Sequence, residues 1–260
     1  MNSLTDNNYH SKLNSFKKSL DLAFNKDSLN IEFFFETTQD FSEFGNLDDV
    51  LSWYQNQKRS LNTTVEHIPL KECRGWEFCN KSGSFVHNSG EFFRVEGYRT
   101  HSSPSREVVS GWDQPFLTQV GYDGGILGLI RKRFNGVPHY LCECKMEPGN
   151  YNLVQITTTI QATFSNLKRA HLGNKTRFSE YFEDPNKHHC NVLLDIWTSE
   201  DGGRLYNKRN RSMLVEHKQD VKLEVEQDNY MWLSLYQIKS LLKFQDAIIS
   251  PHIRGIIATF

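Results

Sequence analysis

The sequence predicts an α+β fold, with a helical N-terminal arm over residues 1–62 and a domain rich in β-strands over residues 63–260. Apolar residues recur at helical spacing near the N-terminus, whereas from about Thr64 short apolar runs alternate with turn sequences. The clearest local signal is Asn135-Gly136 between two apolar-rich runs, a pattern that favours a type I′ hairpin. We therefore expect a mixed or antiparallel sheet flanked by helices.

The arm is expected to hold two amphipathic helices. Apolar residues of the first lie three or four positions apart, at Leu13, Phe16, Leu20 and Phe24. The second is expected over residues 47–61, with Asn46 as its N-cap, acidic residues in its first turn and basic residues near its end. The apolar stripe of the arm must be buried on its own domain or on a partner subunit.

The domain is expected to contain several strands and two C-terminal helices. Alternating or apolar runs predict strands over residues 91–99, 126–134, 137–145, 192–197 and 213–217. Residues 235–242 show helical spacing, and Ser250-Pro251 is typical of an N-cap followed by proline at the first helical position.

Composition excludes some classes of function. The chain has 260 residues, and 30 Lys and Arg against 31 Asp and Glu give a net charge of -1, so it lacks the basic excess of proteins that bind long nucleic acids. No apolar run is long enough to span a membrane, and residues 1–6 do not resemble a secretory signal. We expect a cytoplasmic protein with no nucleic-acid or membrane partner.

The five cysteines are expected to be reduced thiols. Cys142 and Cys144 would share one face of a strand and could hold a metal together with His188, His189 or Cys190. Small buried thiols beside a polar loop are the alternative interpretation. Because the spacing matches no common metal motif, we predict no metal.

Residues 154–164 carry the most informative pattern in the chain. In an extended conformation, period-two alternation places Gln155, Thr157, Thr159, Gln161 and Thr163 on one face, and apolar residues together with Thr158 on the other. The first face is polar but carries no charge, which suits a cavity that binds a ligand rich in hydroxyl and carbonyl groups. An exposed strand rich in threonine is the alternative, because threonine favours sheets.

Two further clusters support a ligand-binding interpretation. Arg204, Lys208, Arg209 and Arg211 fall within eight residues, and in an extended segment the last two point the same way. Paired guanidinium groups suit a diphosphate, although a solvated basic turn gives the same pattern. Trp112 and Gln114 could contact a nucleobase or its ribose, or the tryptophan could be a core residue.

Seven blocks of sequence together resemble the NDP-hexose 2,3-dehydratase family of deoxysugar biosynthesis. In chain order they are SGEFFRVEGY (89–98), WDQPFLTQ (112–119), GILGLI (125–130), KMEPGN (145–150), VQITTTIQATFSN (154–166), SEDGGRLYNKRNRSM (199–213) and WLSLYQIKSLL (232–242). The resemblance covers residues from about 76 to 260.

The resemblance implies a fold related to Nudix hydrolases and a nucleotide-sugar substrate such as dTDP-4-keto-6-deoxyglucose. The glutamate-rich Nudix box is absent from the sequence, so metal-dependent pyrophosphate hydrolysis is not expected. Family members usually carry two copies of this module, whereas this sequence has one, and we expect a homodimer to rebuild the pair.

The implied reaction removes water across C2 and C3 of the sugar. A base takes the C3 proton, donors bind the C4 oxygen as negative charge develops, and an acid protonates the departing C2 hydroxyl. No hydride moves, and the sequence has no glycine-rich dinucleotide motif, so no cofactor is expected.

Candidate residues follow from these roles. For the base we consider Glu147, His171 and Glu200. Thr159, Gln161 and Thr163 are the candidate donors to the sugar and its ketone. Other expected substrate contacts come from Trp112, Gln114, Asn150, Gln155, Asn166 and Arg204, and from Lys208, Arg209 and Arg211 at the diphosphate.

Two other functions fit the same blocks of sequence. One is a module that binds a nucleotide sugar without turnover. The other is a 3-epimerase or isomerase that forms the same enolate, because such an enzyme would exchange the C3 proton without removing water.

Overall fold

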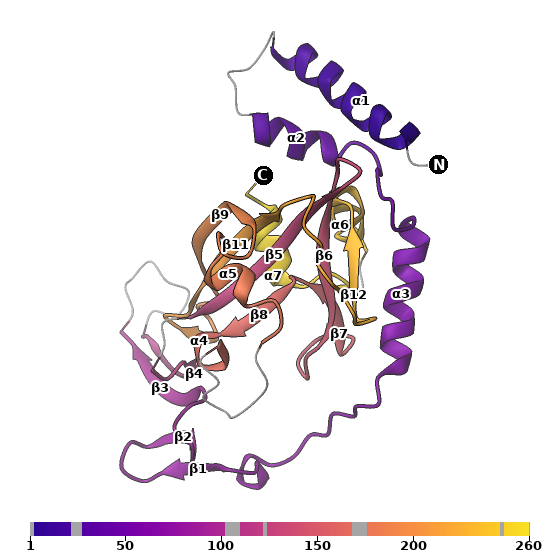
Figure 1. The fold of residues 1–260 in the computed structure, drawn as a ribbon. Coiled ribbons are helices and arrows are strands. Elements are labelled where there is room, and N and C mark those ends of the chain that lie inside the picture. The colour runs from indigo at the N-terminus through magenta and orange to yellow at the C-terminus, as the bar shows by residue number, and fades with distance from the viewer. Residues whose placement is uncertain are drawn as a thin grey trace.

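The structure, a computed structural model, describes residues 3–21, 28–101, 110–121, 124–167, 176–244 and 247–259. Figure 1 shows a large sheet at the centre, a smaller sheet beneath it, and an arm of helices along the upper and right-hand sides. This arrangement confirms the predicted α+β class with mixed sheets flanked by helices.

The large sheet has five strands in its main path. In spatial order they are β12 (Tyr230–Leu233), β6 (Val137–Met146), β5 (Gly125–Phe134), β11 (Arg209–His217) and β9 (Cys190–Ser199). β5 and β11 run parallel, and the other neighbours in this path are antiparallel. Asn135 and Gly136 join β5 to β6 with φ values of 44° and 81°, which confirms the predicted type I′ hairpin.

The hairpin opens into a fork away from its turn. β5 and β6 pair with each other from the turn as far as Ile130 and Leu141. Beyond that point β5 pairs with β8 (Ile160–Thr163), and β6 pairs with β7 (Val154–Thr157). The segment predicted as one continuous strand is therefore two short strands, one on each arm of the fork (Figure 1).

The smaller sheet also has five strands. Their order is β1 (Trp76–Cys79), β2 (Ser84–His87), β3 (Arg94–Thr100), β4 (Trp112–Thr118) and β10 (Leu205–Tyr206). β10 lies parallel to β4. Because β10 belongs to the connection between β9 and β11, this connection links the two sheets.

Apolar clusters cover both faces of the large sheet. Leu129 belongs to the cluster that contains α6 (Leu235–Leu241) and α7 (Pro251–Ile257), whereas its neighbour Ile130 belongs to the cluster that contains α5 (Glu180–Glu183). Burial on both faces explains why the first six residues of β5, Gly125–Ile130, form a continuous apolar run. A fourth short helix, α4 (Phe164–Leu167), follows β8.

Three helices form the predicted arm. They are α1 (Ser3–Asp21), α2 (Ser28–Glu36) and α3 (Leu47–Ser60). Asn46 caps α3 in a reciprocal capping box with Asp49, as its sequence predicts. The sequence did not predict α2, which carries the Phe33–Phe35 run and buries Phe33 and Phe35 while Phe34 is exposed.

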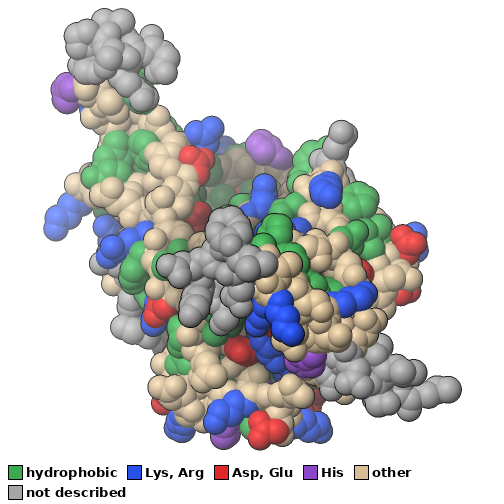
Figure 2. Space-filling model, turned by 90° about the horizontal axis from the view of Figure 1, so that it is seen from above, with side chains coloured by type: hydrophobic (Ala, Val, Ile, Leu, Met, Phe, Trp, Pro, Cys, Tyr) green, Lys and Arg blue, Asp and Glu red, His purple; other side chains and the backbone are tan. Residues whose placement is uncertain are grey.

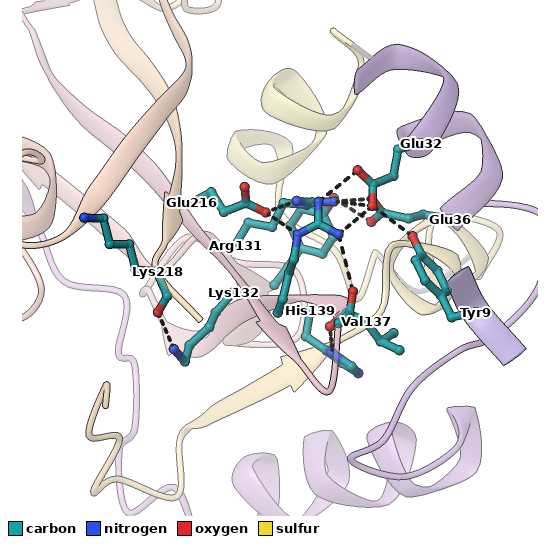
Figure 3. Close-up of polar contacts among 12 residues, drawn as sticks. Tyr9, Glu32, Glu36, Arg131, Lys132, Val137, His139, Glu216 and Lys218 are labelled. Atoms are coloured by element: carbon teal, nitrogen blue, oxygen red, sulfur yellow. Dashed lines mark hydrogen bonds and ion pairs between the residues drawn. The ribbon is translucent and has the colours of Figure 1, made fainter. Parts of the chain in front are cut away.

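The arm is fixed to its own domain by a buried ionic network (Figure 3). Arg131 of β5 is fully buried, contacts Glu216 of β11, and donates to Glu36 of α2 at 2.6 Å. Arg133 donates to both carboxylate oxygens of Glu32, at 2.7 and 2.9 Å. Of the predicted apolar stripe, Leu13 is buried with Phe35 of α2 and Val137 of β6, and Phe16 packs against the same cluster, whereas Phe24 lies outside the described residues.

The outer surface is mixed in character. Figure 2 shows basic, acidic and apolar side chains spread over the face seen from above. This mixture agrees with the net charge of -1. Within the described ranges, none of the helices has the length and apolar composition needed to cross a bilayer.

Candidate functional site

A cleft lies at the fork of the large sheet. Its first half, which we call the turn half, has a volume of about 260 Å³ and is bordered by the turn after β6, by β7 and by the start of α7. Its second half, the loop half, has a volume of about 360 Å³ and is bordered by β8 and the β9–β11 connection. Lys145, Glu147, Gln161 and His252 line both halves, so the two volumes form one fork cleft.

The floor of the fork cleft is uncharged. It consists of Gln155 and Thr157 from β7 and Gln161 and Thr163 from β8. These four residues belong to the polar face predicted from alternation. Gln155 Nε2 donates to the carbonyl oxygen of Ala247 at 2.8 Å, and this bond holds β7 against the segment that precedes α7.

Thr159 departs from the prediction, because its side chain does not reach the cleft. It is fully buried at the point where β5 and β6 separate. Its Oγ1 accepts from the backbone N–H of Ile130 at 2.9 Å and donates to the carbonyl oxygen of Leu141 at 2.5 Å. Thr159 therefore takes the place of the next pair of backbone bonds between β5 and β6, and its hydroxyl does not line the cleft in which a catalytic donor was expected.

An ion pair lies where the two halves of the cleft meet. The Lys145 ammonium is 3.4 Å from Oε1 of Glu147 and donates to the carbonyl oxygen of Gln161 at 3.2 Å. The Glu147 side chain is 43 % exposed. This pair places a positive charge beside the backbone of β8 and a carboxylate at the cleft rim.

Opposite the floor, four polar side chains form a connected wall. Lys208 Nζ donates to Oδ1 of Asn210 at 2.7 Å, and Nδ2 of Asn210 donates to Oε1 of Glu200. The same Glu200 oxygen lies 3.8 Å from Nε2 of His252. Burial lowers the pKa of the Lys208 ammonium to about 8, although the Glu200 carboxylate opposes the shift.

Several predicted site residues are brought together in the cleft. They are Glu147, Asn150, Gln155, Gln161, Thr163 and Lys208, together with Glu200 from the candidate bases. Asn150 Nδ2 donates to the carbonyl oxygens of Lys145 and Leu153 at 3.4 and 3.3 Å, so its amide holds the turn after β6. Their roles toward a substrate stay predictions.

Other predicted residues lie outside the cleft lining. Trp112 Nε1 donates to Oε1 of Gln114 at 2.8 Å, and Gln114 Nε2 donates to the carbonyl oxygen of Gly203 at 2.9 Å. Arg204 is exposed and also donates to Gly203. These three side chains stabilise the junction between β4 and the β9–β11 connection.

The two arginines expected at the diphosphate make contacts within the large sheet. Arg211 donates to both carboxylate oxygens of Asp195, at 2.7 and 2.6 Å. The Arg209 guanidinium lies 4.5 Å from the centre of the Trp197 ring. They share one face of β11, as predicted, but that face does not line the cleft, so the predicted clasp is not formed there.

Two predicted residues lie outside what the structure describes. His171 is outside the described residues, and the side chain of Asn166 in α4 is not described.

The sulfur-rich candidate metal site does not come together. Cys142 and Cys144 belong to the cluster under α6 and α7, and Cys190 belongs to the cluster on the opposite face. Among the residues with described positions, no group of three or more His, Cys, Asp or Glu side chains is placed to hold a metal ion.

Sequence reasoning missed Lys145, His252 and Asn210. Lys145 stands in a block that carries the family resemblance, next to Glu147. His252 follows the Ser250-Pro251 helix start, so its place in the first turn was predictable but its neighbours were not. Only the packing of α7 on β5, β7 and β11 brings it to the cleft.

The matching family model and the three relatives named below indicate the same family. The model of the NDP-hexose 2,3-dehydratase family matches residues 47–260, which include α3 and the whole β-rich region. An Amycolatopsis orientalis protein named dTDP-4-dehydro-6-deoxy-alpha-D-glucopyranose 2,3-dehydratase is 37% identical over 214 residues. Proteins of the same name from Saccharopolyspora spinosa and Streptomyces violaceoruber are 34% and 33% identical over 206 and 209 residues.

The match spans only part of these relatives. It covers 81%, 79% and 80% of this chain but 44%, 40% and 45% of the respective relatives, so the chain spans about half the length of the proteins it matches.

Solved structures add a distant likeness. A Caenorhabditis elegans Ap4A hydrolase is 12% identical with a TM-score of 0.29, and covers 52% of this chain and 91% of its own. The Nudix hydrolase RenU of Mycobacterium smegmatis is 12% identical with a TM-score of 0.30, and covers 54% of this chain and 86% of its own. These scores are too low to support a conclusion about the site. The sequence match, in contrast, covers most of the chain, and on that basis the chain belongs to the NDP-hexose 2,3-dehydratase family.

Proposed function

We propose that this chain is a carbon–oxygen lyase that removes water across C2 and C3 of a dTDP-4-dehydro-6-deoxyhexose, and that the reaction takes place in the fork cleft. The family match and the names of three relatives support the substrate class. The single observation that carries the proposal is the uncharged amide and hydroxyl floor facing a wall of titratable groups.

The charge that develops during the reaction suggests how the sugar is oriented in the cleft. Loss of the C3 proton places negative charge on the C4 oxygen, which hydrogen-bond donors and a nearby cation stabilise. Gln161 and Lys145 supply an amide and an ammonium where the two halves of the cleft meet. We therefore place the C4 oxygen beside these groups, with Thr163 and the rest of the floor binding the other sugar oxygens.

Glu147 takes a different role from the predicted base. Its carboxylate lies 3.4 Å from the Lys145 ammonium and is 43 % exposed, so a neighbouring cation already engages it at the cleft rim. Its place in the proposal is to fix the Lys145 ammonium beside the floor.

Turnover is tested directly. The full chain is incubated with dTDP-4-dehydro-6-deoxyglucose in heavy water, and the nucleotide sugar is followed by mass spectrometry and proton NMR. We expect the nucleotide sugar to lose one water and to give a 3,4-diketo product. Deuterium at C3 without loss of water would indicate a 3-epimerase or isomerase instead. Binding without exchange would indicate a non-catalytic module.

Lys208 is the proposed contact to the diphosphate, and this role predicts a pH dependence. A lysine whose pKa is about 8 loses its charge as the pH rises through 8, so affinity for dTDP-glucose is expected to fall above that pH. The fall should reach up to about tenfold per pH unit. Isothermal titration calorimetry between pH 7 and 9 measures it.

Lys208→Arg is the matched variant, because arginine stays charged over this range. It is expected to bind with an affinity that varies little between pH 7 and 9. An identical decline in both proteins would show that Lys208 does not hold the phosphates.

We also propose a homodimer and a cytoplasmic location. Exposed apolar side chains at Val65, Leu70 and Phe78, in and beside the smaller sheet, support a contact with a second copy. Light scattering tests this against the 30.3 kDa mass of one chain. The five free thiols support a reducing compartment.

A further inference from the structure

The titratable groups of the fork cleft surround one imidazole. His252 lines both halves of the cleft. The charged groups that act on it are Glu200 from the β9–β11 connection, Lys145 and Glu147 at the end of β6, and Lys208 before β11. Each of the four also lines the cleft, so any sugar bound between the floor and the wall lies close to this ring.

Successive side-chain contacts hold the Glu200 carboxylate beside the His252 ring. Asn210 is buried, accepts from Lys208 and donates to Glu200. Glu200 Oε1 then faces Nε2 of His252 at 3.8 Å. At this distance the carboxylate attracts the protonated ring, and contacts of this kind often shorten when substrate binds.

We propose that His252 is the general base that removes the C3 proton, and that Glu200 is its positioning residue. This assignment rests on the function proposed above. It follows from the place of the ring, which lines both halves of the cleft as Gln161 does, and from the neighbouring Glu200 carboxylate held by Asn210.

The proton and electron movements balance within the site. The C3–H bond breaks, its proton passes to the imidazole, and its electron pair forms the enolate whose charge lies on the C4 oxygen. The C2–O bond then breaks as the enolate electrons form the C2–C3 double bond, and the departing hydroxide takes the proton from the imidazolium and leaves as water. The resulting enol becomes the 3,4-diketone by tautomerisation.

The electrostatic setting suits this cycle. Burial lowers the pKa of the His252 ring, and the Glu200 carboxylate opposes this shift. The ring is therefore neutral and able to accept a proton at neutral pH, and Glu200 stabilises the imidazolium formed in the first step.

His252→Asn tests the base, with the full chain and dTDP-4-dehydro-6-deoxyglucose. We expect kcat to fall by about 10²–10⁴-fold, the range for loss of a general acid–base group, while the affinity for dTDP-glucose changes less than about threefold. Imidazole added to His252→Ala should restore part of the turnover, which it would not do for a purely structural residue. His10→Gln, at an exposed histidine of α1, is the control with unchanged kcat.

Glu200→Gln tests the positioning residue. Without the carboxylate the imidazolium is less stable, so the acidic limb of the kcat/KM profile is expected to move to lower pH. A profile that coincides with that of the wild type would remove Glu200 from the assignment.

The outcomes separate the two proposals. A wild-type chain that removes no water would overturn the proposed function together with this inference. An active wild type whose His252→Asn variant keeps its kcat within about threefold, or whose His252→Ala variant gains nothing from imidazole, would overturn the inference alone.

Discussion

The Gln161→Leu variant is expected to lose about 10²–10³-fold in kcat, equivalent to about 2.7–4 kcal/mol of transition-state stabilisation. Gln161 is an amide residue of the floor that lines both halves of the fork cleft, and its backbone carbonyl oxygen accepts from the Lys145 ammonium. Leucine has a similar size but donates no hydrogen bond. The C4 oxygen would then carry its developing charge without this donor.

The control separates loss of a donor from loss of the fold. Gln55→Leu makes the same substitution on the exposed surface of α3 and is expected to keep wild-type kcat. Steady-state kinetics of both variants, with urea unfolding to compare their stabilities, measures the difference. Equal kcat for Gln161→Leu and the wild type would mean that the amide does not bind the reacting oxygen.

Replacing Arg131 by methionine is expected to lower the free energy of unfolding by about 3–5 kcal/mol, the usual cost of removing one partner from a buried ionic network. The network holds three carboxylates, Glu32, Glu36 and Glu216, against two guanidinium groups. Without Arg131, one guanidinium would remain for three carboxylates in a largely buried site.

The two carboxylates of α2 differ in the direction of their pKa shifts, and this difference suggests a second variant. Burial alone would raise the pKa of Glu32, yet the Arg133 hydrogen bonds and the charge of Arg131 lower it to about 2. Complete burial raises the pKa of Glu36 to about 7, although Arg131 opposes this shift. Glu36→Gln removes the excess negative charge and is expected to destabilise the protein much less than Arg131→Met.

Arg99→Met is the matched control, because Arg99 makes a bidentate ion pair with Asp113 that is exposed to solvent. Surface pairs of this kind contribute little to stability. Urea unfolding of the three variants is expected to rank Arg131→Met as the least stable. A stability of Arg131→Met equal to that of Arg99→Met would show that the network does not hold the arm in place.

Local sequence patterns predicted the turn and the helix cap, because neighbouring residues determine them. The Asn135-Gly136 turn and the Asn46 cap depend on residues next to each other in the chain, and both are confirmed. The neutral face of residues 155–163 was also visible, because alternation in a strand is a local property. The position of Thr159 was not visible, because alternation does not reveal that β7 and β8 pair with different strands.

The remaining parts of the site depend on contacts between distant segments. His252 reaches Glu200 across 52 positions of sequence, and α2 is held by arginines about a hundred positions away. The basic cluster at residues 204–211 has a clear composition, yet Asp195 and Trp197 of the neighbouring strand engage two of its arginines. Such pairings follow from the strand order, which the sequence pattern does not contain.

The central claim is that the fork cleft holds a nucleotide sugar with its hexose between the neutral floor and His252. A crystal structure of the full chain with dTDP-glucose measures this directly. We expect the hexose beside Gln161 and the diphosphate beside Lys208. A hexose bound away from the fork, with the cleft still filled by solvent, would contradict it.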